Sequence, residues 1–208
     1  MKIVLTFLLL FIYCISFSQI KMPKDFKELT ESPANGKKLE RVEMDFDGDL
    51  INDVALLVVN EKEFSNYRFL IYISSLKKQY EVVLNKTDFS IYPVQLKVLK
   101  NTIQFGYFQD GTSTFGRFIK IRYNLNKKKI QIIGYDTGYK SLPTEHIDKS
   151  YNLITGKYIV RRTKLNDDEE PIIEEFEGQN NFFKNKVYID NLSIEMLRNL
   201  DDVGSKYE

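Results

Sequence analysis

The chain has 208 residues with one cysteine, one histidine and a formal net charge of +1 at neutral pH. This balance gives no electrostatic reason to expect a nucleic acid or an anionic membrane as partner. One histidine excludes zinc sites built from several imidazoles, and one cysteine excludes an internal disulfide.

Residues 1–18 are typical of a cleavable secretory signal peptide. Lys2 supplies the positive charge, an apolar run covers residues 3–15, and small serines precede the expected cleavage near Ser18 and Gln19. The alternative is a membrane anchor, but a spanning helix needs about 18 to 20 apolar residues and this run is shorter. We therefore expect export to the periplasm or the extracellular space, with no membrane span in the mature chain.

Cleavage would remove Cys14, so the mature chain would depend on a buried core and on any bound metal. Residues 19–38 are polar and broken by two prolines and a glycine, which predicts a loose N-terminal arm that allows one helical turn around residues 25–29. Residues 39–208 are long enough for one ordinary domain with a core.

Strand patterns dominate this domain, because Tyr, Phe, Ile and Val are abundant and alternate with polar residues. We predict strands, in chain order, at residues 39–44, 53–59, 67–73, 79–84, 94–98, 102–108, 115–123, 129–135, 150–154, 157–165, 172–176 and 187–189. Short turns between six of these strands predict three hairpins, spanning residues 94–108, 115–135 and 150–165.

Helical spacing occurs at residues 192–200, where leucines and a methionine share one side and Asn191 is a candidate N-cap. The sequence therefore predicts an all-β fold with a short C-terminal helix. We expect an antiparallel meander arranged as a sandwich or an open barrel. A propeller is less favoured, because propellers close with four or more blades and the strands form about three groups.

One acidic loop has evident chemistry. Asp45, Asp47, Asp49 and Asp53 alternate around Gly48, immediately before an apolar run. Four carboxylates in a tight turn repel one another unless a cation neutralises them. Crowded oxygen ligands suit Ca²⁺, and the glycine permits the bend. The pattern predicts a structural calcium site.

The loop is similar to the calcium loop of the FG-GAP or VCBS-type repeat, in which Asp-x-Asp/Asn-x-Asp-Gly-x-x-Asp joins strands of integrin-like propeller blades. This resemblance implies side-chain ligands from Asp45, Asp47, Asp49 and Asp53, and a backbone carbonyl ligand from Ile51.

Two leucines mark departures from known loops. Leu50 occupies a position that is usually glycine, and leucine does not readily adopt a left-handed conformation. Leu56 stands where an EF-hand has its bidentate glutamate, so the loop is not an EF-hand. A solvated Asp-Gly turn and a catalytic carboxylate pair remain alternatives to the calcium site.

A fainter resemblance, carried by the acidic loop together with residues 118–123, 132–135 and 150–157, is to small exported bacterial proteins of unknown function. It implies a location in the cell envelope and no defined activity.

Other candidate residues have ordinary interpretations. His146 is expected in a loop, because no nucleophile signature accompanies it. Residues 109–116 form either a hairpin turn or a recognition loop, in which Asp110 could reach a metal. The acidic run at residues 167–170 is expected to be a solvated turn. The tyrosines at positions 135, 139, 151 and 158 are expected to pack against neighbours rather than to stack on sugars.

We therefore expect an exported, non-catalytic β-domain with a structural calcium loop that binds an envelope or extracellular protein or glycan. The alternative is a carboxylate-dependent hydrolase acting on glycans, with Asp45 and Asp49, or Asp110, as acid and base.

Overall fold

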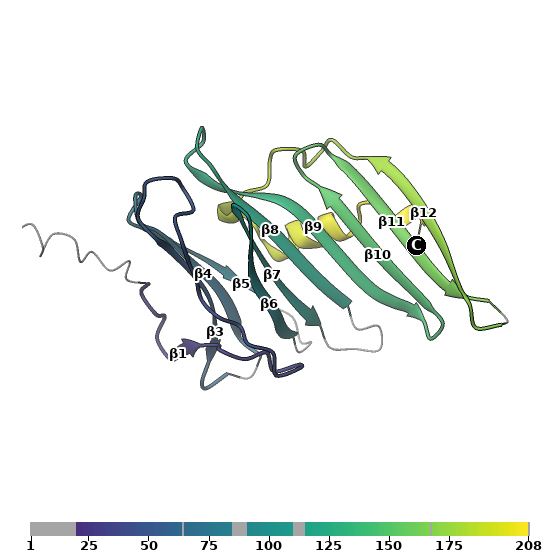
Figure 1. Cartoon of the computed structure of the whole chain (residues 1–208), viewed down its shortest axis with the longest axis horizontal. Coiled ribbons are helices and arrows are strands. Elements are labelled where there is room, and N and C mark those ends of the chain that lie inside the picture. Colours follow the sequence, from purple (N-terminus) through teal and green to yellow (C-terminus); the bar gives the residue numbers. More distant parts are fainter. Residues whose placement is uncertain (1–19, 64, 85–90, 110–114, 167, 208) are drawn as a thin grey trace, which may run out of the picture.

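The computed structural model describes residues 20–63, 65–84, 91–109, 115–166 and 168–207. They form two antiparallel β-sheets and one short α-helix near the C-terminus (Figure 1). The predicted all-β class with a C-terminal helix is confirmed, and the described strands do not close into a barrel. The predicted leader, residues 1–18, lies outside the described residues. Among the described residues, no helix has the length and apolar character needed to cross a bilayer.

The first sheet is built around one strand that is buried on both faces. Its strands are β1 (Phe26–Glu28), β2 (Val42–Met44), β3 (Asp53–Asn60), β4 (Tyr67–Ile73) and β5 (Lys78–Val83). The short β1 and β2 pair with opposite ends of β3 on one side, and β4 pairs with β3 on the other. Alternate residues of β3 pack into the main core and into a smaller cluster that includes Phe26 and Leu70, which explains the continuous apolar run.

The N-terminal arm contributes to this sheet. Phe26 is buried and pairs with Asn60, so β1 stands where the sequence allowed a helical turn. A single apolar side chain between Asp25 and Lys27 gives too little pattern to distinguish a three-residue edge strand from a helical turn.

The second sheet is a seven-stranded meander in which each strand pairs with the next. Its strands are β6 (Ile91–Leu99), β7 (Thr102–Gln109), β8 (Phe115–Asn124), β9 (Lys129–Leu142), β10 (Glu145–Asn152), β11 (Lys157–Leu165) and β12 (Pro171–Gln179). All three predicted hairpins are confirmed. A further hairpin joins β9 to β10, which the sequence did not predict because the inward positions of β10 include the charged residues Glu145 and Lys149.

The C-terminal segment contains η1 (Ile189–Asn191), α2 (Ile194–Asp201) and η2 (Ser205–Tyr207). The N-cap of α2 is Ser193, whose Oγ accepts the Met196 amide, rather than the expected Asn191. The predicted strand at residues 187–189 is wrong, since a single bridge between Gln131 and Tyr188 is followed by a 3-10 turn. The β10 strand occupies the edge of β9 from residue 134 onward, so little of that edge is left to pair.

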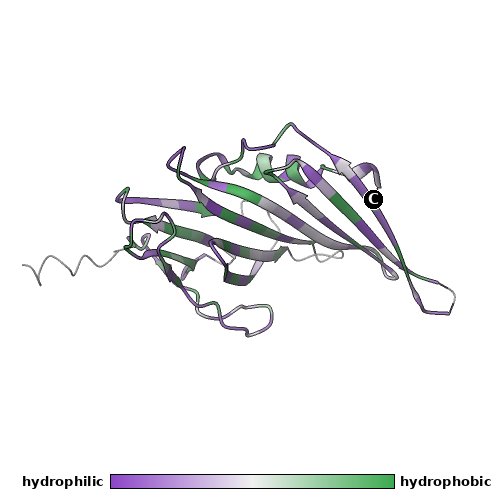
Figure 2. Ribbon diagram, turned by 45° about the horizontal axis from the view of Figure 1, so that its top comes forward, coloured by the Kyte–Doolittle hydropathy of each residue, from purple (hydrophilic) through white to green (hydrophobic). Residues whose placement is uncertain are grey.

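One face of the second sheet is covered at both ends. The Phe69 ring of β4 stacks on Phe105 of β7 with centroids 4.1 Å apart, which seats the first sheet there. Leu197 and Leu200 of α2 are buried in the same core cluster (Figure 1). Figure 2 shows apolar and polar residues interleaved along the strands, as expected for sheets with one buried face. Among the described residues, no helix or second sheet packs on the opposite face of β7–β11, which we call the open face.

A buried polar network fastens α2 to this sheet. Asp201 accepts from Arg117 Nη2 at 2.6 Å and from the Tyr135 hydroxyl at 2.5 Å, and Lys149 donates to the Asp201 carbonyl. Burial raises the pKa of Tyr107 beside this network to about 12 and keeps the pKa of Tyr135 well above its usual value. The phenols therefore stay protonated and neutral at physiological pH.

Removing the carboxylate of Asp201 should be strongly destabilising. Asp201→Ala would leave Arg117 largely buried without its counter-charge, which costs about 3 to 5 kcal/mol of unfolding free energy. Urea unfolding at neutral pH measures this loss. Asp202→Ala is the matched control, because Asp202 is exposed at the end of the same helix. Equal losses in the two variants would contradict the role of the network.

A second buried acid gives a pH-dependent prediction. Hydrogen bonds from Arg162 and Ser141 hold the pKa of Glu145 below its ordinary value of 4.5. The native state therefore binds this proton more weakly than the unfolded chain, so the carboxylate stabilises the fold above pH 4.5 and loses this effect as pH falls through the lowered native pKa.

The difference in unfolding free energy between the parent and Glu145→Gln should accordingly be largest near neutral pH and shrink below pH 4.5. Urea unfolding at a series of pH values between about 3 and 7 measures it. A difference that stays constant over this range would refute the prediction.

Candidate functional site

The acidic loop connects β2 to β3, and its two ends lie side by side. Met44 pairs with Asp53 at the close of the loop, so the intervening residues must turn within a short distance. Gly48 and Leu50 both have left-handed backbone, with φ of 86° and 70°. Leu50 thus adopts the left-handed conformation that leucine does not readily adopt, and it is 93% exposed.

Three carboxylates converge in this loop. Asp45, Asp47 and Asp49 each offer an oxygen, and these atoms lie within 4.8 Å of one another, which is close enough to hold one metal ion. The loop's own amides orient the carboxylates. Asp45 accepts from Gly48 N at 2.6 Å and from Leu50 N at 2.9 Å.

Asp53 lies apart from this group and is almost fully buried. One of its oxygens accepts the Phe46 amide at 3.0 Å, and the other accepts the amide and hydroxyl of Ser74 at 2.7 and 2.9 Å. Burial raises the pKa of Asp53 against the opposing effect of these hydrogen bonds, and the nearby Asp47 adds to the rise. Asp53 therefore joins the loop to the β4–β5 turn, while its role as a metal ligand, like that of the Ile51 carbonyl, stays a prediction.

The acidic loop borders a small depression of about 290 Å³. Asp47 and Asp49 form one side of it, with Ser75 from the β4–β5 turn and Tyr123 from the end of β8. The Ser75 hydroxyl donates to Asp47, and burial together with the charge of Asp47 raises the pKa of Tyr123. The loop is thus bonded to the first sheet and shares a depression with the second.

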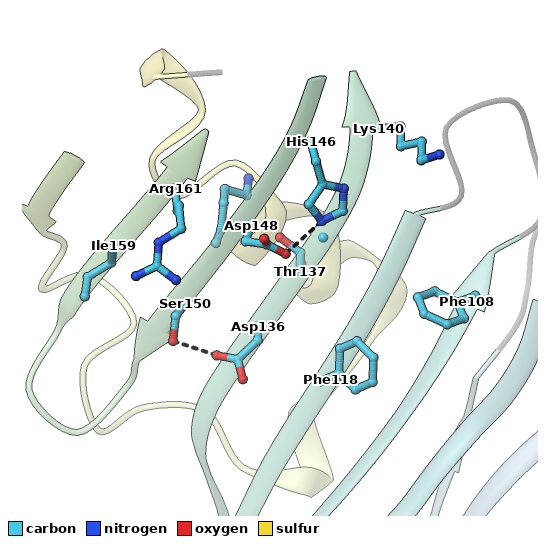
Figure 3. Close-up of a pocket in the computed structure, with 12 residues that line it drawn as sticks. Phe108, Phe118, Asp136, Thr137, Lys140, His146, Asp148, Ser150, Ile159 and Arg161 are labelled. Atoms are coloured by element: carbon cyan, nitrogen blue, oxygen red, sulfur yellow. Dashed lines mark hydrogen bonds and ion pairs between the residues drawn. The ribbon is translucent and has the colours of Figure 1, made fainter. Parts of the chain in front are cut away.

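A larger groove lies elsewhere, on the open face of the second sheet, with a volume of about 680 Å³. Figure 3 shows two aromatic rings on one side, Ile159 and Arg161 on the other, and polar side chains between them. Its lining comes from five consecutive strands: Phe108 from β7, Phe118 from β8, Asp136, Thr137, Gly138 and Lys140 from β9, His146, Asp148, Lys149 and Ser150 from β10, and Ile159 and Arg161 from β11.

Glycines allow the two rings to lie against the sheet. A Cβ on Gly106 would stand 2.2 Å from Phe118, and a Cβ on Gly116 would stand 2.6 Å from Phe108, so neither position accepts a side chain without moving a ring. Gly138 pairs with Gly116 on the neighbouring strand. Of these two glycines only Gly138 borders the groove, where it leaves space for the side chains of Asp148 and His146.

The polar side chains of the groove are held by their neighbours. The Ser150 hydroxyl donates to Asp136 at 2.7 Å, and the ammonium of Lys120 lies 2.7 Å from the other oxygen of Asp136. His146 Nε2 lies 3.0 Å from Asp148 Oδ1 (Figure 3). These contacts fix the carboxylates without using all of their acceptor capacity.

Sequence reasoning did not identify this groove. His146 was expected in a loop but lies in β10, facing Gly138. The available signal was glycine and phenylalanine interleaved in β7 and β8, but nothing in the sequence showed which strands would be neighbours. Asp110 lies outside the described residues. The tyrosines pack against neighbours as predicted. Tyr135, Tyr151 and Tyr158 are buried in the core, and Tyr139 stacks on Phe115.

Comparisons of this chain with protein-family models, with curated proteins and with solved structures give no match. Both sites must therefore be interpreted from their own geometry.

The left-handed leucine gives a prediction for the loop. Leu50→Gly should raise the unfolding free energy by about 0.5 to 1 kcal/mol, because relief of left-handed strain outweighs the added entropy of the unfolded chain. Thermal or urea unfolding without metal measures the change. Leu125→Gly is the control, since Leu125 is also exposed but does not have positive φ. Equal or opposite effects of the two substitutions would contradict the strain.

Proposed function

We propose that this protein is an exported, non-catalytic β-domain whose acidic loop binds Ca²⁺ and whose exposed surface binds an envelope or extracellular protein or glycan. The observation that carries the calcium proposal is the convergence of Asp45, Asp47 and Asp49, with oxygens within 4.8 Å of one another. Three carboxylates this close repel one another, and a divalent cation removes that repulsion.

The chemistry of the site favours Ca²⁺ over other cations. All candidate ligands are oxygens, and neither histidine nor cysteine belongs to the described cluster, which does not fit zinc or softer metals. Calcium accepts six to eight oxygens in an irregular shell, and Asp53 and the Ile51 carbonyl would add to the three carboxylates. The resemblance to FG-GAP-type loops supports the same ligand set.

Bound calcium would have a structural role. Asp47 bonds Ser75, and Asp53 bonds Ser74, so the ligands are already tied to the turn between β4 and β5. A cation between the carboxylates would hold β2, β3 and this turn together. Because the loop also borders Tyr123 of β8, it would steady the contact between the two sheets.

The geometry favours this role over acid–base catalysis at the loop. A glycosidase needs two carboxyl groups about 5 to 10 Å apart on either side of a substrate. The loop carboxylates instead lie within 4.8 Å of one another and accept hydrogen bonds from the amides of their own loop. The arrangement resembles a ligand cage more than an acid–base pair.

Calcium should stabilise the protein by binding the native state. At a free Ca²⁺ concentration about a hundred times the dissociation constant, the unfolding free energy should rise by about 2.7 kcal/mol. Thermal unfolding in millimolar Ca²⁺ and in chelator measures the shift. Asp47→Asn preserves the size of the side chain but removes its charge, and it should abolish most of the shift.

Asp168→Asn is the matched control, because Asp168 is exposed in a turn remote in sequence from the loop. It should retain the full calcium response. Unchanged unfolding of the parent protein at millimolar Ca²⁺ would refute the calcium site.

A further inference from the structure

We propose that the groove on the open face of the second sheet binds a neutral carbohydrate. This inference rests on the proposed binding role and deepens it, because it names the site and the class of ligand. It does not depend on the calcium loop, which the second sheet meets through its covered face at Tyr123.

The size and construction of the groove suit a small ligand. Its volume of about 680 Å³ lies within the range of about 300 to 1,000 Å³ that small-molecule sites occupy. Five consecutive strands supply the lining, and each is paired on both sides. Side chains on such strands are held more precisely than side chains on loops, so the site is largely preformed.

The aromatic wall suits the apolar face of a sugar ring. Phe108 and Phe118 have centroids 5.9 Å apart with planes at 87°, so a ligand beside them meets the face of one ring and the edge of the other. Both rings are only partly buried. Gly106 and Gly116 leave room for the rings to lie against the sheet, so a sugar ring can stack on them without displacing a side chain beneath.

The polar groups suit paired hydroxyls. Asp136 and Asp148 offer acceptors, while Arg161 offers donors, since its Nε and Nη2 both bond Glu175 and its Nη1 takes no part in that contact. His146 presents its second ring nitrogen. A sugar hydroxyl both donates and accepts, so it can satisfy carboxylate and guanidinium partners at once.

The balance of charge points to a neutral ligand. Two carboxylates, Asp136 and Asp148, line the groove together with three cations, Lys140, Lys149 and Arg161. The ammonium of Lys149 bonds the Asp201 carbonyl on the covered side of the sheet, so two acids and two bases face the groove. A charged ligand would meet groups of its own sign, and a wholly apolar ligand would leave carboxylates desolvated without partners, which is costly. A neutral molecule rich in hydroxyls avoids both penalties.

The backbone argues against an extended peptide as the occupant. Peptides that add to a sheet bond the free backbone groups of an edge strand. Every strand that lines this groove already pairs with a neighbour on each side, so the groove offers no such edge. Recognition must therefore come from side chains.

Titration of the full chain with neutral trisaccharides tests the proposal. Maltotriose, cellotriose, laminaritriose and mannotriose are the probes, with trigalacturonate and a chitosan trimer as anionic and cationic comparators, followed by NMR chemical shifts or calorimetry. At least one neutral probe should bind more tightly than both charged comparators. Failure of every neutral probe at about 10 mM, or tighter binding of a charged one, would overturn the proposal.

Substitutions locate the binding. Phe118→Ala should weaken it by about tenfold or more, while Phe182→Ala, which removes a ring that is 71% exposed outside the groove, should leave it unchanged. Arg161→Gln is a second test should Phe118→Ala impair folding, and Arg122→Gln on the exposed side of β8 is its control. Unchanged affinity in the groove variants would overturn the assigned site.

The same assay separates this inference from the calcium proposal. Asp47→Asn should lose the calcium-dependent stabilisation and keep the saccharide affinity. If the parent protein shows the calcium response but binds no saccharide, the carbohydrate proposal is refuted and the calcium proposal stands.

Discussion

The ion pair between Arg117 and Asp201 fastens α2 to the apolar face of the second sheet. Arg117 points inward from β8, where a cation is tolerated only because the helix delivers a carboxylate to it. Burial alone would lower the pKa of Arg117, but Tyr107, Tyr135 and Asp201 raise it, so the cation is retained. With α2 fixed on that face and the first sheet beside it, no other described helix or sheet is left to cover the opposite face. The groove lies on this opposite face.

Local patterns account for most of the predicted fold. Strands with apolar residues on alternate positions, such as β4 and β8, were predicted close to their observed bounds. The β9–β10 hairpin was missed because Glu145 and Lys149 occupy inward positions, and only their partners on other elements make that burial tolerable. The strand expected near Val187 failed for a different reason. Its alternation correctly indicated burial, but pairing depends on whether an edge is free.

The two candidate sites differ in how visible they are in a sequence. The acidic loop draws its carboxylates from one turn, so spacing alone indicated it, and the unfavourable position of Leu50 was correctly recognised as a departure. Spacing gave no hint that Asp53 would be directed toward Ser74. The groove assembles single residues from five strands, and its existence depends on register. His146 belongs to no sequence motif, so its place in the groove is evident only once β10 is paired with β9.

The shape of the groove depends on the absence of a side chain at Gly138. A Cβ at Gly138 would lie 2.8 Å from a carboxylate oxygen of Asp148, which sits at the mobile end of its side chain. A single methyl group there would turn that carboxylate aside and make the groove shallower, while leaving the pairing of β8 and β9 intact. One small residue therefore sets the depth of the groove without any change in the strands around it.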